Sequence, residues 1–199
     1  MKDQLIELPF FPLSIILLPG EEVPLHIFEP RYQQLLNDLK QGDTQFGIPY
    51  FSKSNTKQIG TLVKLVDITK RYGDGRADII IEGCGNFQLM EFHQVWNKKQ
   101  YGGGKIKPIE RSNKELPFEL IERFWNFLKL STLDDIELYQ LRGKKIEELA
   151  GTLTLSSEEK LAFLNFPHRT KIKFVENRLQ YLSILFEQEN NTENNFYLN

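Results

Sequence analysis

The sequence predicts an α+β fold in which an N-terminal antiparallel β-barrel with one inserted helix is followed by a C-terminal α-helical bundle. Up to about Glu110, short runs of β-branched and aromatic residues alternate with clusters of Gly, Pro, Asn or Asp, which is typical of strands and turns. Beyond that residue, apolar residues recur with a period of about 3.6, which is typical of helices. We therefore predict subdomains at 1–110 and 111–188, and a disordered tail at 189–199.

The strands of the first subdomain are expected where β-formers gather: Leu5–Leu8, Ile15–Leu18, Phe46–Phe51, Ile59–Lys70, Ala77–Glu82, Phe87–Val95 and Lys105–Ile109. The segment Tyr72–Arg76 holds two glycines that can adopt positive φ, so it predicts a hairpin. A helix is expected from Pro30 to about Lys40, because proline suits its first position and leucines follow at helical spacing. We interpret the run Gly102–Gly104 as a flexible hairpin.

The second subdomain is expected to begin its first helix at Pro117, with one apolar stripe. Ser156 and Glu159 match a capping box, in which each residue's side chain bonds the other's backbone amide. A last helix is predicted from about Arg169 to Glu187. The polar, Asn-rich segment that follows has no periodicity, which favours the disordered tail.

Composition narrows the class of protein. The 199 residues hold 25 basic and 27 acidic side chains, so the net charge of -2 gives no general attraction to nucleic acid or to an anionic membrane. A single cysteine excludes an internal disulfide and is typical of a reducing compartment, so we predict a cytoplasmic protein. The apolar run Ile15–Leu18 is too short to span a bilayer, and no membrane association is expected.

Few residues suggest chemistry. The three histidines, at 26, 93 and 168, and Cys84 show no metal-ligand spacing, so we expect no metal and no cofactor. We interpret His26 as a residue of the barrel whose ring nitrogens have hydrogen-bond partners, or as a side chain at the rim of the barrel. An enzyme that uses Cys84 or His26 stays as an alternative, although nothing around the thiol marks an activated thiolate. The glycines before Lys105 and Lys144 do not fit a phosphate-binding loop, since neither lysine is followed by Ser or Thr.

The opening of the chain, Leu8 to Tyr32 (LPFFPLSIILLPGEEVPLHIFEPRY), resembles the start of the Lon N-terminal domain. Further segments that are similar to this family follow in the expected order: Ile59–Val63, Ile80–Gly83, Leu149–Leu155, Ser157–Leu161 and Arg178–Leu182. The resemblance thus covers nearly the whole chain. One departure follows Gly83, where the family usually places an arginine and this chain has Cys84–Gln88. We expect Asn86 to fill a turn position there.

The resemblance implies a PUA-like barrel and a non-catalytic module that recognises proteins, without the ATPase and protease modules that full-length Lon proteases carry. The implied partners are unfolded or extended polypeptides, and a separate protease or chaperone if the protein acts as an adaptor in proteolysis. We predict that a groove with an apolar rim binds them. The candidate contact residues are Pro9, Phe10, Phe11, Leu25, Phe28, Tyr50 and Phe51.

RNA binding is the main alternative, because PUA-like folds bind RNA elsewhere. Basic residues gather at Lys98, Lys99, Lys105, Lys107 and Arg111, and again at Arg169, Lys171, Lys173 and Arg178. Trp96 and Tyr101 lie near the first group in sequence and are possible stacking groups. Acidic residues elsewhere offset these charges, so the sequence favours a protein partner over nucleic acid.

Overall fold

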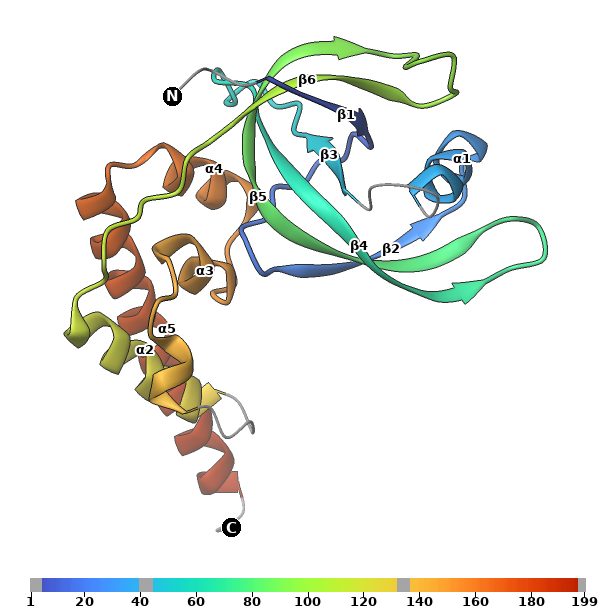
Figure 1. The fold of residues 1–199 in the computed structure, drawn as a ribbon. Helices are drawn as coiled ribbons and strands as arrows, with labels where there is room; N and C mark the ends of the chain where they lie inside the picture. The colour runs from blue at the N-terminus through green and yellow to red at the C-terminus, as the bar shows by residue number, and fades with distance from the viewer. Residues whose placement is uncertain (1–4, 40–44, 132–136, 197–199) are drawn as a thin grey trace. The chain divides into compact units, whose positions relative to one another are not determined.

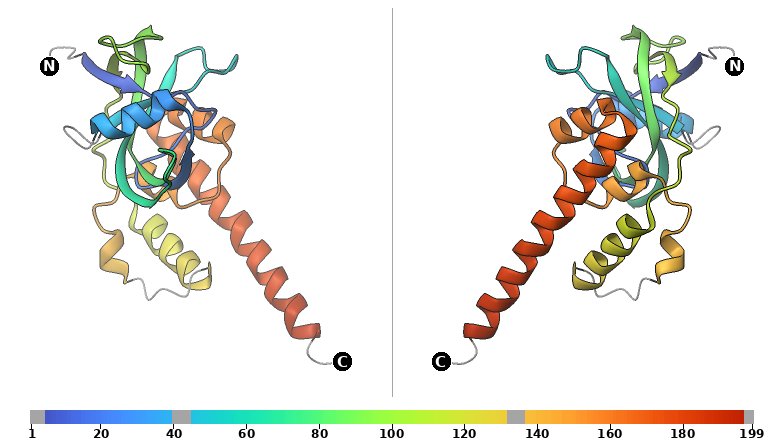
Figure 2. Two further views of the ribbon diagram at one scale, coloured as in Figure 1. Left: turned by 90° about the vertical axis from the view of Figure 1, so that its right-hand side faces the viewer. Right: turned by 90° about the vertical axis from the view of Figure 1, so that its left-hand side faces the viewer.

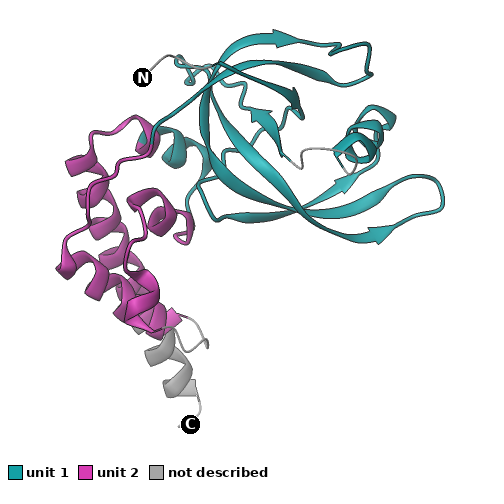
Figure 3. Ribbon diagram, viewed as in Figure 1, with its two compact units in different colours: residues 1–110, 155–162 teal, residues 111–154, 163–199 magenta. Residues whose placement is uncertain are grey.

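The computed structural model describes residues 5–39, 45–131 and 137–196. The chain divides into two compact units, residues 1–110 with 155–162 and residues 111–154 with 163–199 (Figure 3). Each is described by itself below. The predicted division into subdomains at 1–110 and 111–188 stays a prediction. Within the described residues, none of the helices combines the length and the apolar character needed to cross a membrane.

The first unit is built on a six-stranded sheet (Figure 1). Its strands are β1 (Ile6–Phe10), β2 (Glu22–Ile27), β3 (Gln45–Pro49), β4 (Ile59–Arg71), β5 (Ala77–His93) and β6 (Gly102–Pro108). They are ordered β2-β5-β4-β3-β1-β6, and β5 also pairs with β6. We predicted antiparallel pairing throughout, and this was wrong at one place. Strand β1 runs parallel to β3, with Phe10 opposite Gly47, because the chain passes through α1 before it returns as β3.

Two local predictions in this unit are confirmed. Helix α1 (Pro30–Leu39) buries Tyr32, Leu35, Leu36 and Leu39 against the sheet. The hairpin between β4 and β5 closes with Arg71 opposite Ala77 and a bond from the Tyr72 N–H to the Arg76 carbonyl (2.9 Å). Gly75 adopts φ +92°, as the turn requires. In both cases the signal lies within a few neighbouring residues.

The segment Ile15–Leu18 is buried as expected, but it is not a strand. Side chains form the hydrogen bonds to its backbone groups that we expected a neighbouring strand to form. The Leu17 N–H donates to Thr61 Oγ1 (3.0 Å), and the Leu17 carbonyl accepts from Asn86 Nδ2 (3.0 Å). Asn86 therefore stabilises a buried crossing segment and does not form the turn that we predicted.

Strand β5 is continuous from Ala77 to His93, where the sequence led us to expect two strands. Gly83 lies between the two predicted strands, and it is needed for close approach. A Cβ atom at Gly83 would lie 2.4 Å from the Leu18 carbonyl oxygen. The glycine run 102–104 is likewise part of β6 and not a flexible hairpin, because Cβ atoms at Gly103 and Gly104 would meet Trp96 and the backbone of Glu91.

The second unit consists of helices. They are α2 (Phe118–Ser131), the 3₁₀ turn η1 (Leu138–Leu141), α3 (Ile146–Gly151) and α5 (His168–Phe196). Phe127 on α2 packs edge-on against Phe186 on α5, with ring centroids 5.9 Å apart. The buried Glu147 carboxylate of α3 is paired with Lys171 of α5 at 2.7 Å. These contacts place α2 and α3 against the same long helix.

Helix α5 is longer than predicted (Figure 2). Its backbone continues to Phe196, so residues 189–196 are helical where we expected a disordered tail. No glycine or proline lies between His168 and Phe196, and nothing local ends the helix. Residues 197–199 of the predicted tail lie outside the described residues.

Helix α4 (Ser157–Asn165) begins in the first unit. Its capping box is confirmed, since the Ser156 N–H donates to the Glu159 carboxylate (2.8 Å) and the Glu159 N–H donates to Ser156 Oγ (3.2 Å). Two contacts explain why residues 155–162 belong with the sheet. Lys160 Nζ pairs with Glu21 at 2.6 Å, and the Ile16 N–H donates to Ser157 Oγ.

Candidate peptide-binding cleft

The structure separates the seven predicted contact residues. Phe10 and Phe11 lie in the core, and their exposed fractions are 0% and 8%. Pro9 is half-buried in β1 opposite Gly103. These three residues therefore offer little side-chain surface to a partner. In the sequence they could not be distinguished from the predicted contact residues that are accessible.

Tyr50 and Phe51 line a cleft of about 620 Å³ in the first unit. One wall is the segment that joins β3 to β4, and the other is the last part of β5. The lining residues are Tyr50, Phe51, Ser52, Lys53, Asn55, Gln58, Leu89, Met90 and Phe92. A volume of this size lies within the range of sites that bind small molecules or short peptide segments.

The cleft exposes a cluster of large apolar side chains. Phe51, Met90 and Phe92 have exposed fractions of 59%, 48% and 37%. The Phe51 ring packs edge-on against Phe92 at 5.4 Å, and Phe92 stacks on the buried Phe10 at 6.0 Å. The exposed rings are thus supported by the core behind them, and water leaves an accessible apolar surface when a partner covers it.

A buried asparagine holds the loop 50–58 in shape. Asn55 Nδ2 donates to the carbonyls of Tyr50 and Ile59, both at 2.7 Å, and Asn55 Oδ1 accepts from the Ile59 N–H at 2.8 Å. One side chain therefore closes both ends of the loop. The Tyr50 hydroxyl, which donates to Glu158 at 3.2 Å, fixes the first end further.

Sequence reasoning missed the wall formed by Leu89, Met90 and Phe92. A β-bulge lies there, because Leu89 pairs with Ile106 while Glu91 pairs with the adjacent Lys105. Met90 is the extra residue, and a bulge redirects side chains. The available signal was the adjacent pair Leu89 and Met90, since two large apolar neighbours break the alternation expected of a strand with one buried face.

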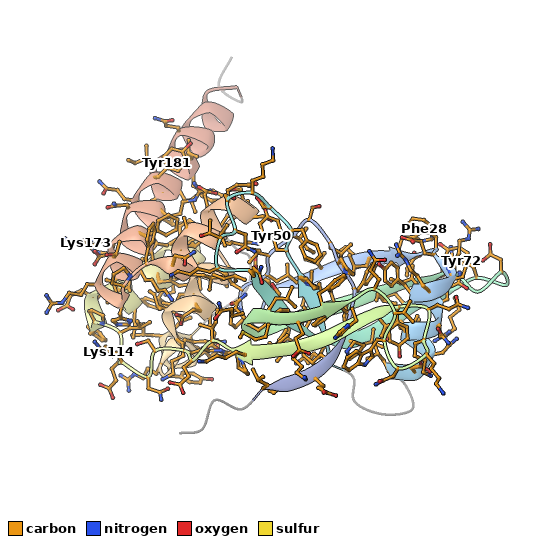
Figure 4. All side chains as sticks on the ribbon, turned by 90° about the horizontal axis from the view of Figure 1, so that it is seen from above. Phe28, Tyr50, Tyr72, Lys114, Lys173 and Tyr181 are labelled. Atoms are coloured by element: carbon orange, nitrogen blue, oxygen red, sulfur yellow. The ribbon has the colours of Figure 1, made fainter. Side chains whose placement is uncertain are left out.

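Leu25 and Phe28 lie elsewhere in the first unit. Leu25 is half-buried in β2, and Phe28 follows that strand with an exposed fraction of 61%. Figure 4 shows Phe28 beside Tyr72, at the far end of the sheet from Tyr50. The predicted residues therefore fall at two separate surfaces, and the cleft is the one with a hollow.

His26 forms a polar cluster near Phe28. His26 Nδ1 contacts the Asp78 carboxylate at 2.6 Å, and the Tyr72 hydroxyl donates to the other carboxylate oxygen at 2.8 Å. Asp78 and Cys84 are separated by about 20 Å along β5. The two candidates of the enzyme alternative, Cys84 and His26, thus lie at separate places along β5, since His26 on β2 is opposite Asp78. Within the described residues, His, Cys, Asp and Glu form no group of three that could hold a metal ion.

Because of this cluster, we expect the protein to lose stability at acid pH. Asp78→Asn should reduce this loss. Hydrogen bonds from His26 and Tyr72 hold the pKa of Asp78 below its usual value. A carboxyl with a lowered pKa stabilises the fold above the unfolded pKa of about 3.9, and this contribution is lost as the pH falls through the folded value. In urea denaturation at pH 7 and pH 3, the unmodified protein should therefore lose more stability than Asp78→Asn.

The control for this comparison is Asp67→Asn, which removes an exposed carboxyl from the neighbouring strand β4. It should leave the acid response of the protein in place. Equal losses of stability in the unmodified protein and in Asp78→Asn would contradict the assignment.

The basic group considered for RNA is partly neutralised. Lys99 pairs with Asp38 at 3.0 Å, and Lys105 pairs with Glu91 at 3.0 Å. Both pairs are partly exposed, and they reduce the local positive charge that a phosphate backbone would meet. The structure therefore adds no support to the nucleic-acid alternative.

The class of protein follows from comparisons with known proteins, which identify a substrate-binding domain. The model of the ATP-dependent protease La (LON) substrate-binding domain matches residues 7–183. A solved Lon N-terminal domain protein from Xanthomonas campestris is 25% identical, with a TM-score of 0.60 over 90% of this chain and 98% of that chain. No curated protein matches the sequence.

The N-terminal domain of the Mycobacterium avium complex Lon protease has the same fold, with 14% identity and a TM-score of 0.58 over 88% of this chain and 98% of that one. Since the family model covers most of the sequence, this chain belongs to the Lon substrate-binding domain family. The resemblance found in the sequence is thereby confirmed, and with it a substrate-binding module.

Proposed function

We propose that the protein binds unfolded or extended polypeptides without transforming them, and that the cleft lined by Phe51, Met90 and Phe92 receives their apolar side chains. The observation that carries this proposal is the exposure of these three side chains around a hollow of about 620 Å³. Unfolded chains differ from folded ones chiefly in their accessible apolar side chains, and such a cleft selects for that difference.

The local architecture supports this function. Binding residues are most effective when their own positions are fixed, because less conformational entropy is lost on binding. Asn55 fixes the loop, and Phe10 supports Phe92 from the core. Phe51 remains largely exposed on this rigid base.

The test is the affinity for a fluorescently labelled, casein-like unfolded chain, measured by anisotropy. Phe51→Ala should weaken binding about tenfold, which is the effect expected for a central aromatic contact. Phe28→Ala is the matched control, because it removes the same side chain from a position of similar exposure, 61% against 59%, at the other surface. It should change the affinity less than twofold.

The opposite result, with Phe28→Ala weakening binding and Phe51→Ala having no effect, would contradict the cleft and place the site near β2. A labelled RNA is the third probe. RNA binding that falls steeply with salt, together with no binding of the unfolded chain, would favour the alternative function.

We further propose the finer features that the sequence suggested. The sheet is a closed, PUA-like barrel; this is supported by β5, which pairs with β4 up to Gln88 and with β6 from Phe87 onward, so that the ladder returns to its starting strand. The helices of residues 111–188 form a bundle around α5. The protein is proposed to be cytoplasmic and to act as an adaptor that presents bound chains to a separate protease or chaperone.

A further inference from the structure

Strand β5 extends beyond the strand beside it. Strand β4 begins at Ile59, opposite Gln88, while β5 continues to His93. On its other side this last part is paired with β6, where Phe92 lies opposite Gly104. On the β4 side, the described residues supply one further backbone bond beyond Gln88, from the Leu89 N–H to the Gln58 carbonyl at 2.9 Å.

The gap exists because the chain turns away before β4 begins. Gln58 adopts φ +53°, a left-handed conformation that a strand cannot continue through. Asn55 then fixes the preceding loop through its bond to the Tyr50 carbonyl. The place that an extension of β4 would occupy is therefore the cleft, with Phe51 across from the strand edge.

Exposure along β5 changes at the same point. From Ala77 to Phe87 most residues are buried or half-buried, in the pattern of a strand flanked by others. From Met90 to His93 every residue is exposed, although one edge is still paired with β6. This last part of β5 is therefore accessible to solvent along its whole length.

We infer that an extended segment of the bound polypeptide adds to this edge as a further strand beside Met90–His93. The inference rests on the proposed function and deepens it, since it adds recognition of the main chain to the capture of side chains. Four residues of β5 span about 13 Å, which a short peptide segment matches. Strand addition derives affinity from backbone hydrogen bonds and selectivity from pockets for alternate side chains.

Charge specifies the flanks of this segment. The loop 50–58 carries Lys53 and Lys57 and no acidic residue. Within the residues that the structure describes, neither lysine has an ion-pair partner, whereas Lys105 on β6 pairs with Glu91. The preferred occupant is therefore an extended segment with an aromatic side chain at Phe51 and acidic residues beside it.

The test uses an eight-residue peptide with one central phenylalanine flanked by aspartates, and versions of it with a single N-methyl group at each backbone position. Because successive N–H groups of a strand point in opposite directions, methylation at every second position should weaken binding about fivefold or more. Methylation at the intervening positions should change the affinity less than twofold. Binding of the parent peptide should also slow hydrogen exchange at those amides of residues 90–93 that point to the open edge.

A charge variant tests the flanks. Lys53→Glu should weaken binding of this peptide about fivefold and should have less effect on a version with lysines in place of the aspartates. Lys114→Glu, an exposed lysine of the second unit, is the control and should leave both affinities unchanged.

The outcomes separate the two proposals. If the peptide binds in a Phe51-dependent manner but methylation shows no alternation and residues 90–93 exchange as before, strand addition is wrong and the cleft remains a side-chain site. If unfolded chains bind through Phe51 but the acidic peptide does not, the inferred occupant is wrong. If neither binds, or if Phe51→Ala has no effect on either, the proposed function itself fails.

Discussion

Replacing Gly104 by alanine should lower the free energy of unfolding by about 3 kcal/mol. The added Cβ atom would lie 2.0 Å from the Glu91 carbonyl oxygen and 3.1 Å from the Phe10 ring. A backbone oxygen cannot move aside as a flexible side chain can, so β5 and β6 must separate where they pair. Since Glu91 belongs to the part of β5 that borders the cleft, peptide affinity should fall as well.

Urea denaturation measures this effect, and Gly73→Ala is its control. Gly73 lies in the β4–β5 hairpin, where a Cβ atom would meet nothing within 4 Å. That variant should keep its stability within about 0.5 kcal/mol. A similar, small change in both variants would show that the close approach of Gly104 to β5 is not a constraint on the fold.

The second large effect is expected for Asn55→Ala, which should cost about 2 kcal/mol of stability and remove most of the peptide affinity. The substitution removes Asn55 Nδ2, which donates to the carbonyls of both Tyr50 and Ile59, and leaves these carbonyls without that donor. The loop should then open to hydrate them, and Phe51 would lose its fixed position opposite Phe92. Denaturation and anisotropy measurements on the same preparation test both parts.

Asn55→Asp tests whether the hydrogen bonds of Asn55, and not the size of its side chain, hold the loop in place. The aspartate keeps an oxygen for the Ile59 N–H, but it would face two carbonyl oxygens with a carboxylate in place of an amide donor. It should therefore behave like Asn55→Ala. Thr56→Ala, at the neighbouring exposed position, should resemble the unmodified protein. Normal peptide binding by Asn55→Asp would contradict the role given to the loop.

The sequence predicted those elements whose causes are local. Helix α1, the Tyr72–Arg76 turn and the capping box at Ser156 depend on residues within a few positions of each other. Prediction from the sequence failed where a glycine or an asparagine makes or allows a contact with residues that are distant in the sequence. Gly83, Asn86 and Gly104 resemble turn residues in sequence, but they allow or make contacts with Leu18, Leu17 and Glu91.

The candidate site was predicted in part for the same reason. Phe10 and Phe51 have similar neighbours in sequence, yet one is buried by strands that are remote in sequence and the other is exposed. The second wall of the cleft depends on the bulge at Met90 and on where β4 begins, and both are set by pairing between strands. The adjacent pair Leu89 and Met90 is a local sign of the bulge, but no local pattern records which strand will pair with another.

The pairing of β1 with β6 also has a consequence for biosynthesis. Ile6 lies opposite Ile106, so the first strand finds this partner only after the last strand of the sheet has left the ribosome. At a translation rate of about 5–20 residues per second, the edge of β1 that pairs with β6 stays open for on the order of 5 to 20 seconds. A protein of this topology must itself pass through an unfolded form of the kind that we propose it binds.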